Sequence, residues 1–134
     1  MKRRLLEGSL ILVILICGCS VQDPRRMAQT NITLAIENSR FHPQRWIVPS
    51  GKEIHLHIEN PAGDQHDIVI LKGQALGETD PAIFENQFWS VAINQTMLEV
   101  TFLSPAMPGE YRIVCSVGDH QEKGEQGILV VVIP

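Results

Sequence analysis

The residues best suited to bind a metal lie close together near the end of the chain. Cys115 is followed five residues later by His120, and Glu125 comes five residues after that histidine. Thiolate and imidazole groups are strong ligands for transition metals. An accessible cysteine without a ligand is open to oxidation, so we expect Cys115 to be either metal-bound or deeply buried.

The N-terminal segment indicates that the protein is exported. Residues 1–18 begin with basic side chains, continue through an apolar run at 10–16 and end on small residues, as secretory signals do. The apolar run is too short for a comfortable membrane span. We therefore predict that residues 1–18 are a signal peptide.

The end of this segment resembles a bacterial lipobox, in which a signal peptidase cuts before a cysteine that carries a thioether-linked lipid. Small Gly18 precedes Cys19, whereas bulky Ile16 precedes Cys17, so Cys19 is the expected lipidation site. An ordinary signal peptide or an uncleaved anchor is the alternative. Both cysteines then lie outside the folded domain, and residues 19–29 form a lipidated N-terminus and tether.

The remaining chain has the size of one small domain. Without the signal peptide about 115 residues remain, which is enough for a single core. The net charge of the whole chain is −4, and residues 1–18 hold more basic than acidic side chains, so the exported part is more acidic still. A phosphate backbone needs a basic protein face, so we expect no nucleic-acid partner. A disulfide within the domain is excluded, because Cys115 is its only cysteine.

Alternating apolar and polar residues indicate that the domain, residues 30–134, is built from β-strands. Convincing helical periodicity is missing, and turn residues separate the alternating segments. The segments that read as strands are 32–36, 54–58, 67–71, 97–102, 111–115 and 128–133. Residues 73–90 have the weakest pattern, and they could form a short helix or an excursion between strands. Short strands at this density predict an all-β antiparallel sandwich.

The histidines separate into sheet-face and sheet-end positions. His55 and His57 alternate with apolar residues, which puts both on the outward face of their strand, where solvation is favoured over a weak surface metal site. His42 precedes a proline and is expected in a loop. His66 opens a predicted strand after a turn, and His120 lies in a turn between two strands. These two sheet-end histidines could converge with the cysteine on one metal.

Several segments of the domain share the pattern of a known family. They are 41–43, 47–51, the strand ending at Asn60, His66, 108–115 and 127–130. With them the domain resembles the cupredoxin family of small blue copper proteins, which includes plastocyanin, azurin and rusticyanin. The family spacing Cys-x4-His is weak evidence alone, but its place after a Pro-Gly-x-Tyr strand makes the match specific. The resemblance implies a Greek-key β-sandwich of about seven or eight strands.

The resemblance also implies one copper ion bound by His66, Cys115 and His120. Two imidazoles and one thiolate in a trigonal set, with a weak axial ligand, let copper pass between Cu(I) and Cu(II) with little ligand movement. Where the family usually has an axial methionine, this chain has Glu125, so the resemblance implies a carboxylate ligand there. The alternatives are Gln126, if the loop slips by one residue, and a Glu125 that merely faces solvent.

Two further positions depart from the family pattern. Gly118-Asp119 replaces the usual Pro-Gly before the loop histidine. The residue after the early histidine, often asparagine, is Asp67. In the family this side chain ties the two ligand loops together through the residue beside the cysteine, which is Ser116 here.

The resemblance implies a one-electron carrier rather than an enzyme. Its lipid would hold it at the membrane on the extracytoplasmic or periplasmic side, where it would exchange electrons with unidentified redox proteins. The first alternative is copper handling, meaning storage or delivery of the metal. The second, less favoured, is a catalytic mononuclear copper site, because a carboxylate ligand can make room for a small exogenous ligand.

Overall fold

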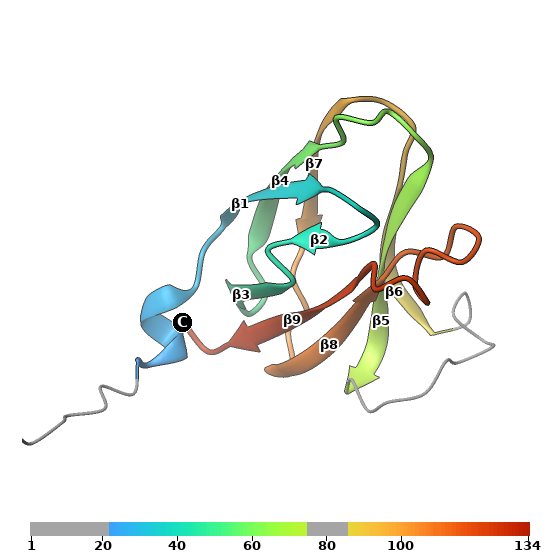
Figure 1. Cartoon of the computed structure of the whole chain (residues 1–134). Coiled ribbons are helices and arrows are strands. Elements are labelled where there is room, and N and C mark those ends of the chain that lie inside the picture. Colours follow the sequence, from blue (N-terminus) through green and yellow to red (C-terminus); the bar gives the residue numbers. More distant parts are fainter. Residues whose placement is uncertain (1–21, 75–85) are drawn as a thin grey trace, which may run out of the picture.

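The computed structural model describes residues 22–74 and 86–134, which fold into two β-sheets packed face to face (Figure 1). A short 3-10 helix, η1 (Pro24–Met27), precedes the strands. The strands are β1 (Asn31–Ile36), β2 (Phe41–His42), β3 (Arg45–Pro49), β4 (Glu53–Glu59), β5 (His66–Gln74), β6 (Gln87–Ile93), β7 (Met97–Leu103), β8 (Gly109–Val114) and β9 (Gln126–Val132). One sheet has the order β2-β1-β4-β7 and the other the order β3-β9-β8-β5-β6. The predicted all-β sandwich is thus confirmed.

The core lies between the two sheets, and in strands such as β4 it follows from alternation. In β4, Ile54, Leu56 and Ile58 are buried while His55 is exposed. Side chains at alternate positions of a strand point to the same face, so these three apolar groups meet the other sheet. Trp46 of β3 is also buried, and its indole N–H donates to a backbone carbonyl at 2.8 Å. That bond satisfies the one polar group of the side chain.

All the predicted strands are present, and the structure adds β2, β3 and β6, so residues 22–74 and 86–134 form nine strands instead of seven or eight. β2 has only two residues, and β3 ends in Pro49, so neither gives a clear strand signal. β6 begins within the stretch 73–90, for which the sequence favours a short helix or an excursion between strands, and it continues to Ile93. His42 belongs to β2 rather than to a loop.

The sheets are mixed rather than purely antiparallel. β1 pairs with β4 in parallel, as β3 does with β9, whereas the other pairs are antiparallel. Between β1 and β4 the chain crosses to the other sheet through β3 and returns, which gives β4 the direction of β1. Alternation identifies the buried face of a strand but not the direction of its neighbour.

The predicted signal peptide, Cys17 and Cys19 fall within residues 1–21 and lie outside the described residues, as do residues 75–85. Within the described ranges no helix is long and apolar enough to cross a membrane. The described part of the tether contains η1, whose cap, Asp23, accepts a hydrogen bond from the backbone N–H of Arg25 at 3.0 Å.

Candidate metal centre

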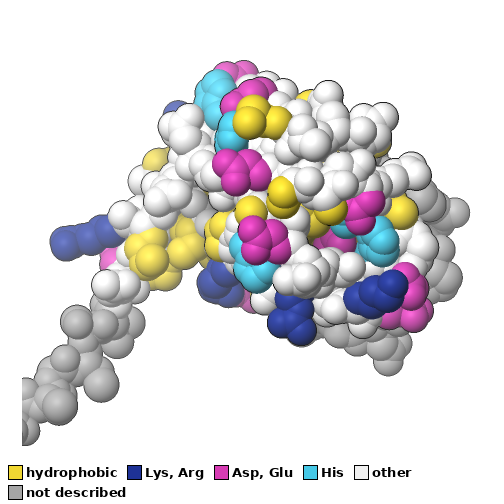
Figure 2. Space-filling view, turned by 45° about the horizontal axis from the view of Figure 1, so that its top comes forward, with side chains coloured by type: hydrophobic (Ala, Val, Ile, Leu, Met, Phe, Trp, Pro, Cys, Tyr) yellow, Lys and Arg dark blue, Asp and Glu magenta, His cyan; other side chains and the backbone are white. Residues whose placement is uncertain are grey.

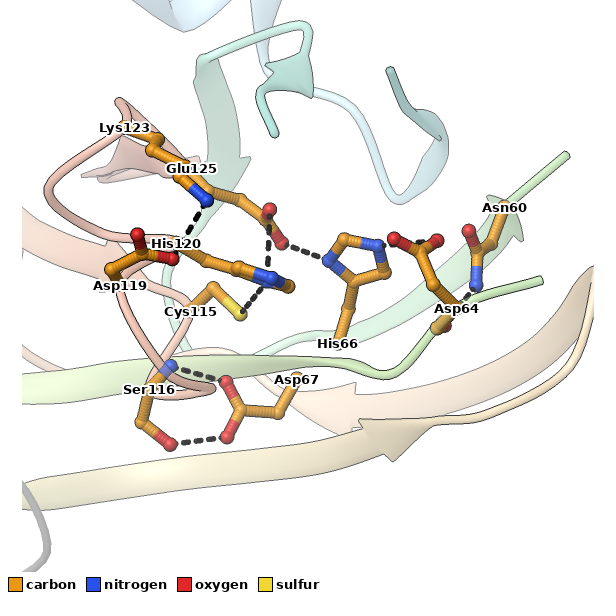
Figure 3. A network of polar contacts seen from close by, with 10 residues as sticks. All are labelled: Asn60, Asp64, His66, Asp67, Cys115, Ser116, Asp119, His120, Lys123 and Glu125. Atoms are coloured by element: carbon orange, nitrogen blue, oxygen red, sulfur yellow. Dashed lines mark hydrogen bonds and ion pairs between the residues drawn. The ribbon is translucent and has the colours of Figure 1, made fainter. Parts of the chain in front are cut away.

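Four potential metal ligands meet at one end of the sandwich (Figure 3). His66, Cys115, His120 and Glu125 each offer one ligand atom, and these atoms lie within 4.8 Å of one another. The Sγ atom of Cys115 is 3.6 Å from Nδ1 of His120, and the centroids of the two histidine rings are 4.8 Å apart. The structure therefore brings together the residues that the sequence resemblance implies as ligands.

Three neighbouring strands place these side chains. β5 begins at His66, β8 ends at Val114 just before Cys115, and β9 begins at Gln126 just after Glu125. β8 lies between β5 and β9 and is antiparallel to both. The start of β5, the end of β8 and the start of β9 consequently share one end of the sheet.

Backbone hydrogen bonds hold the loop that carries three of these residues. The N–H of Cys115 donates to the carbonyl of Glu125 at 3.0 Å, and the N–H of Glu125 donates to the carbonyl of His120 at 3.0 Å. Gly124 has a φ of +107°, which L side chains rarely adopt, so glycine suits the last turn of the loop. The loop backbone is thus fixed on both sides of the cluster.

The ring of His66 lies between two carboxylates. Its Nδ1 is 2.7 Å from Oε1 of Glu125 inside the cluster, and its Nε2 is 2.9 Å from Oδ1 of Asp64 on the other side. The hydrogen bond from His66 lowers the pKa of the Asp64 carboxyl group. Asp64 was not among the predicted site residues, and its only signal in the sequence is an acidic side chain two positions before a candidate ligand.

Cys115 is fully buried. Burial raises the pKa of its thiol to about 12, and the nearby carboxylates of Glu125 and Asp67 add to the rise. The group is therefore a neutral thiol near neutral pH, and binding a metal as the thiolate would release a proton. Burial is one of the two states expected for this cysteine from the sequence, and it would limit oxidation of the thiol.

Glu125 is the clearest sign that the cluster accommodates a cation. Its side chain is fully buried, and Oε2 has no hydrogen-bond partner within the described residues, with Nδ1 of His120 at 3.5 Å. A buried carboxylate oxygen without a partner is costly, and a metal cation would satisfy it. Two imidazoles, one thiolate and one carboxylate fit copper, because the thiolate suits Cu(I) and imidazole suits both oxidation states.

Asp67 joins the two segments that carry the candidate ligands. The backbone N–H of Ser116 donates to Oδ1 of Asp67 at 2.6 Å, and the hydroxyl of Ser116 donates to Oδ2. Asp67 follows His66 directly, and Ser116 follows Cys115. These two bonds tie the start of β5 to the end of β8, which is the role that the resemblance implies for Asp67.

The other candidates from the sequence lie outside the cluster. His55 and His57 face outward from β4, and they pair with Glu53 at 3.5 Å and with Glu99, respectively. Figure 2 shows histidine and acidic side chains next to each other on the surface. Gln126 is exposed whereas Glu125 is buried, which favours the glutamate as the axial residue.

Comparisons with known proteins agree with this geometry. The sequence profile of the family described as "Cupredoxin-like domain" matches residues 9–131. No curated protein sequence matches the chain significantly.

Several solved structures are similar to the chain. A dithionite-reduced auracyanin from Roseiflexus castenholzii is 28% identical with a TM-score of 0.64, and the match covers 78% of this chain and 98% of that one. Auracyanin A from Chloroflexus aurantiacus, described as a "blue" copper protein, is 26% identical with a TM-score of 0.62, covering 76% and 98%. Reduced rusticyanin, at 16% identity and a TM-score of 0.51 over 78% and 81%, supports the fold alone.

Proposed function

This chain belongs to the cupredoxin-like domain family, and on that premise we propose that it is a one-electron carrier with a single copper ion. His66, Cys115 and His120 would bind the copper, and Glu125 would complete the site as the axial ligand. Bound copper supplies the change between Cu(I) and Cu(II). The protein supplies a rigid ligand set and a route to the surface.

The observation that carries this proposal is one cluster of four donors at one end of the sheet, three of them buried and His120 partly exposed. Three of the donors belong to a loop closed by backbone hydrogen bonds, and Asp67 ties that loop to the strand of His66. Such ligands need to move little when the charge of the metal changes. Low reorganisation favours electron transfer over the release of the metal to another protein.

His120 offers the route by which electrons would reach a partner. Its side chain is 18% exposed, whereas those of His66 and Glu125 are 3% and 0% exposed. Cys115 is fully buried. Within this cluster the imidazole of His120 is therefore the group that a partner could approach.

The first test is an absorption spectrum of the oxidised protein together with a redox titration. We expect about one copper per chain, an intense thiolate-to-copper absorption and reversible one-electron cycling. A site that stays locked as Cu(I) would contradict the carrier and support copper handling. A spectral change on adding nitrite, azide or nitric oxide would instead support a catalytic site that opens at the carboxylate.

We also propose that lipid on Cys19 holds the protein at the extracytoplasmic or periplasmic face of the membrane, where redox proteins would be its partners. Each buried methylene group contributes about 0.8 kcal/mol, so one acyl chain gives marginal anchoring and several give stable anchoring. Detergent should therefore release the wild-type protein from membranes, and Cys19→Ala should block lipid attachment and maturation. Mass spectrometry of the N-terminal peptide measures the modification directly.

Cys17→Ala is the matched control, since it removes a cysteine two residues away and should leave lipidation intact. A wild-type chain found soluble and without lipid would show that the lipobox interpretation is wrong. Lipid on Cys17 instead of Cys19 would contradict the predicted cleavage point.

A further inference from the structure

The ring of His66 has a contact that the proposed ligand set leaves unexplained. Glu125 meets Nδ1 at 2.7 Å inside the cluster, and Asp64 meets Nε2 at 2.9 Å on the opposite side (Figure 3). Asp64 is not one of the four clustered donors. A neutral imidazole carries a single proton, so the partner of Nε2 helps to decide which nitrogen keeps it.

We propose that Asp64 is a positioning residue, which accepts the Nε2 proton of His66 and so leaves the Nδ1 lone pair free for copper. This inference rests on the proposed function, because it concerns the same site. Metal-bound histidines often donate their second ring N–H to a carboxylate, which fixes the tautomer and the orientation of the ring and raises its basicity. Asp64 lies where such a carboxylate is required.

The turn before β5 holds Asp64 in this position. The side-chain amide of Asn60, which is fully buried, donates from Nδ2 to the carbonyl of Asp64 at 2.8 Å. The N–H of Gly63 donates to the carbonyl of Asn60, and the N–H of Asn60 donates to the carbonyl of Thr96, both at 2.9 Å. Buried contacts thus fix the backbone of Asp64, although its side chain is 57% exposed.

The charge of Asp64 should also influence the redox equilibrium. A carboxylate on the Nε2 side makes the imidazole a stronger donor, which stabilises Cu(II) more than Cu(I). Because the Asp64 side chain is partly exposed, solvent and salt weaken the direct Coulomb attraction, and the hydrogen bond carries most of the effect. We therefore expect Asp64 to lower the reduction potential of the site.

The first measurement follows the ring proton in metal-free protein with 15N-labelled histidine. The Nε2–H of His66 is buried and bonded to a carboxylate, so it should exchange slowly with solvent. Asp64→Ala should speed this exchange about ten-fold or more, because a hydrogen bond to a charged group contributes about 1.5–3 kcal/mol. Asp64→Asn keeps an oxygen acceptor and should retain slow exchange.

The second measurement compares copper binding and potential in the same variants. Asp64→Ala should weaken Cu(II) binding about 10–100-fold and Cu(I) binding less. Each ten-fold difference between the two oxidation states raises the potential by about 59 mV. Asp64→Asn should raise the potential less than Asp64→Ala does, since it retains the hydrogen bond and loses only the screened charge.

Asp119→Asn is the matched control. Asp119 adjoins the other candidate histidine in the sequence, but its carboxylate pairs with Lys123 at 2.8 Å. This variant should keep wild-type proton exchange and potential. An equal shift of potential in Asp119→Asn would overturn the proposal, because any nearby charge would then suffice.

If Asp64→Ala keeps the proton exchange rate, the copper affinity and the reduction potential of the wild type, the proposed role of Asp64 is likewise overturned. Failure of the proposed function can be distinguished from failure of the role of Asp64, because the wild-type protein would then show no thiolate-to-copper absorption. Proton exchange in the metal-free protein would still test the contact between Asp64 and His66 in that case.

Discussion

Replacing Cys115 by serine is expected to abolish the intense thiolate-to-copper absorption, whatever the axial ligand is. The transition requires a copper–sulfur bond, and Cys115 is the only cysteine after residue 19. Copper affinity should fall by more than about 100-fold, since losing even an outer partner of a ligand costs about 10–100-fold. Titration with Cu(II), followed by absorption and by metal analysis, measures both effects.

The serine variant should still fold, so that loss of colour reports on the site. The backbone N–H of residue 115 keeps its bond to the carbonyl of Glu125, and a buried hydroxyl left without a partner costs about 1–3 kcal/mol. Circular dichroism and a thermal melt check this. Equal absorption in Cys115→Ser and wild type would rule out the proposed site.

Histidine variants extend the same experiment. Alanine in place of His66 or His120 should weaken copper binding and change the spectrum, because both rings belong to the cluster. Alanine in place of His55 or His57 is the matched control, since these rings lie on the outward face of β4 and pair with glutamates. A larger effect from His57→Ala than from His66→Ala would contradict the assignment of ligands.

The convergence of the site could be predicted because its residues flank strongly patterned strands. The segments 67–71, 111–115 and 128–133 are apolar and bounded by turn residues, so β5, β8 and β9 could be recognised, and the candidate ligands lie at their ends or in the loop between β8 and β9. Once three neighbouring strands are known to be antiparallel, their adjoining ends must meet. The sequence alone could not predict that Glu125 is buried and Gln126 exposed. That difference depends on the conformation of the loop around Gly124.

Other features depend on contacts between residues that are distant or weakly patterned. The parallel pairing of β1 with β4 arises from a crossover through β3, and alternation carries no information on strand direction. The bond between Asp64 and His66 depends on the turn that Asn60 anchors. The sequence does not predict this bond, because an aspartate that precedes a histidine by two residues in a turn usually faces solvent.

Glu125→Met is expected to raise the reduction potential and to change the colour of the oxidised protein. With one thiolate and one carboxylate, the Cu(II) site is neutral and the Cu(I) site carries a net negative charge, so the carboxylate favours Cu(II). Two unit charges 4 Å apart interact by about 4 kcal/mol at an effective dielectric of 20, which is a generous bound. Since a ten-fold change in a one-electron equilibrium is about 59 mV, the rise should be on the order of 100–200 mV.

The colour should change in the same variant. Glu125 would offer copper a hard carboxylate oxygen, and such a ligand would weaken the copper–sulfur bond. The wild-type protein should therefore be green or red rather than blue, and Glu125→Met should turn it bluer. Spectroelectrochemistry records the spectrum and the potential in one experiment.

Glu125→Gln separates the charge of this side chain from its shape. The amide keeps an oxygen donor in the same buried place, so the potential should rise through the loss of charge while the colour stays closer to wild type than in Glu125→Met. Gln126→Ala is the control, because Gln126 is exposed at the start of β9 and should affect neither property. If Glu125→Met leaves the spectrum and the potential unchanged while Gln126→Ala alters both, the axial ligand is Gln126. The buried Oε2 of Glu125, which has no hydrogen-bond partner in the part of the chain that the structure describes, would then need another partner, since a carboxylate oxygen is costly to bury alone.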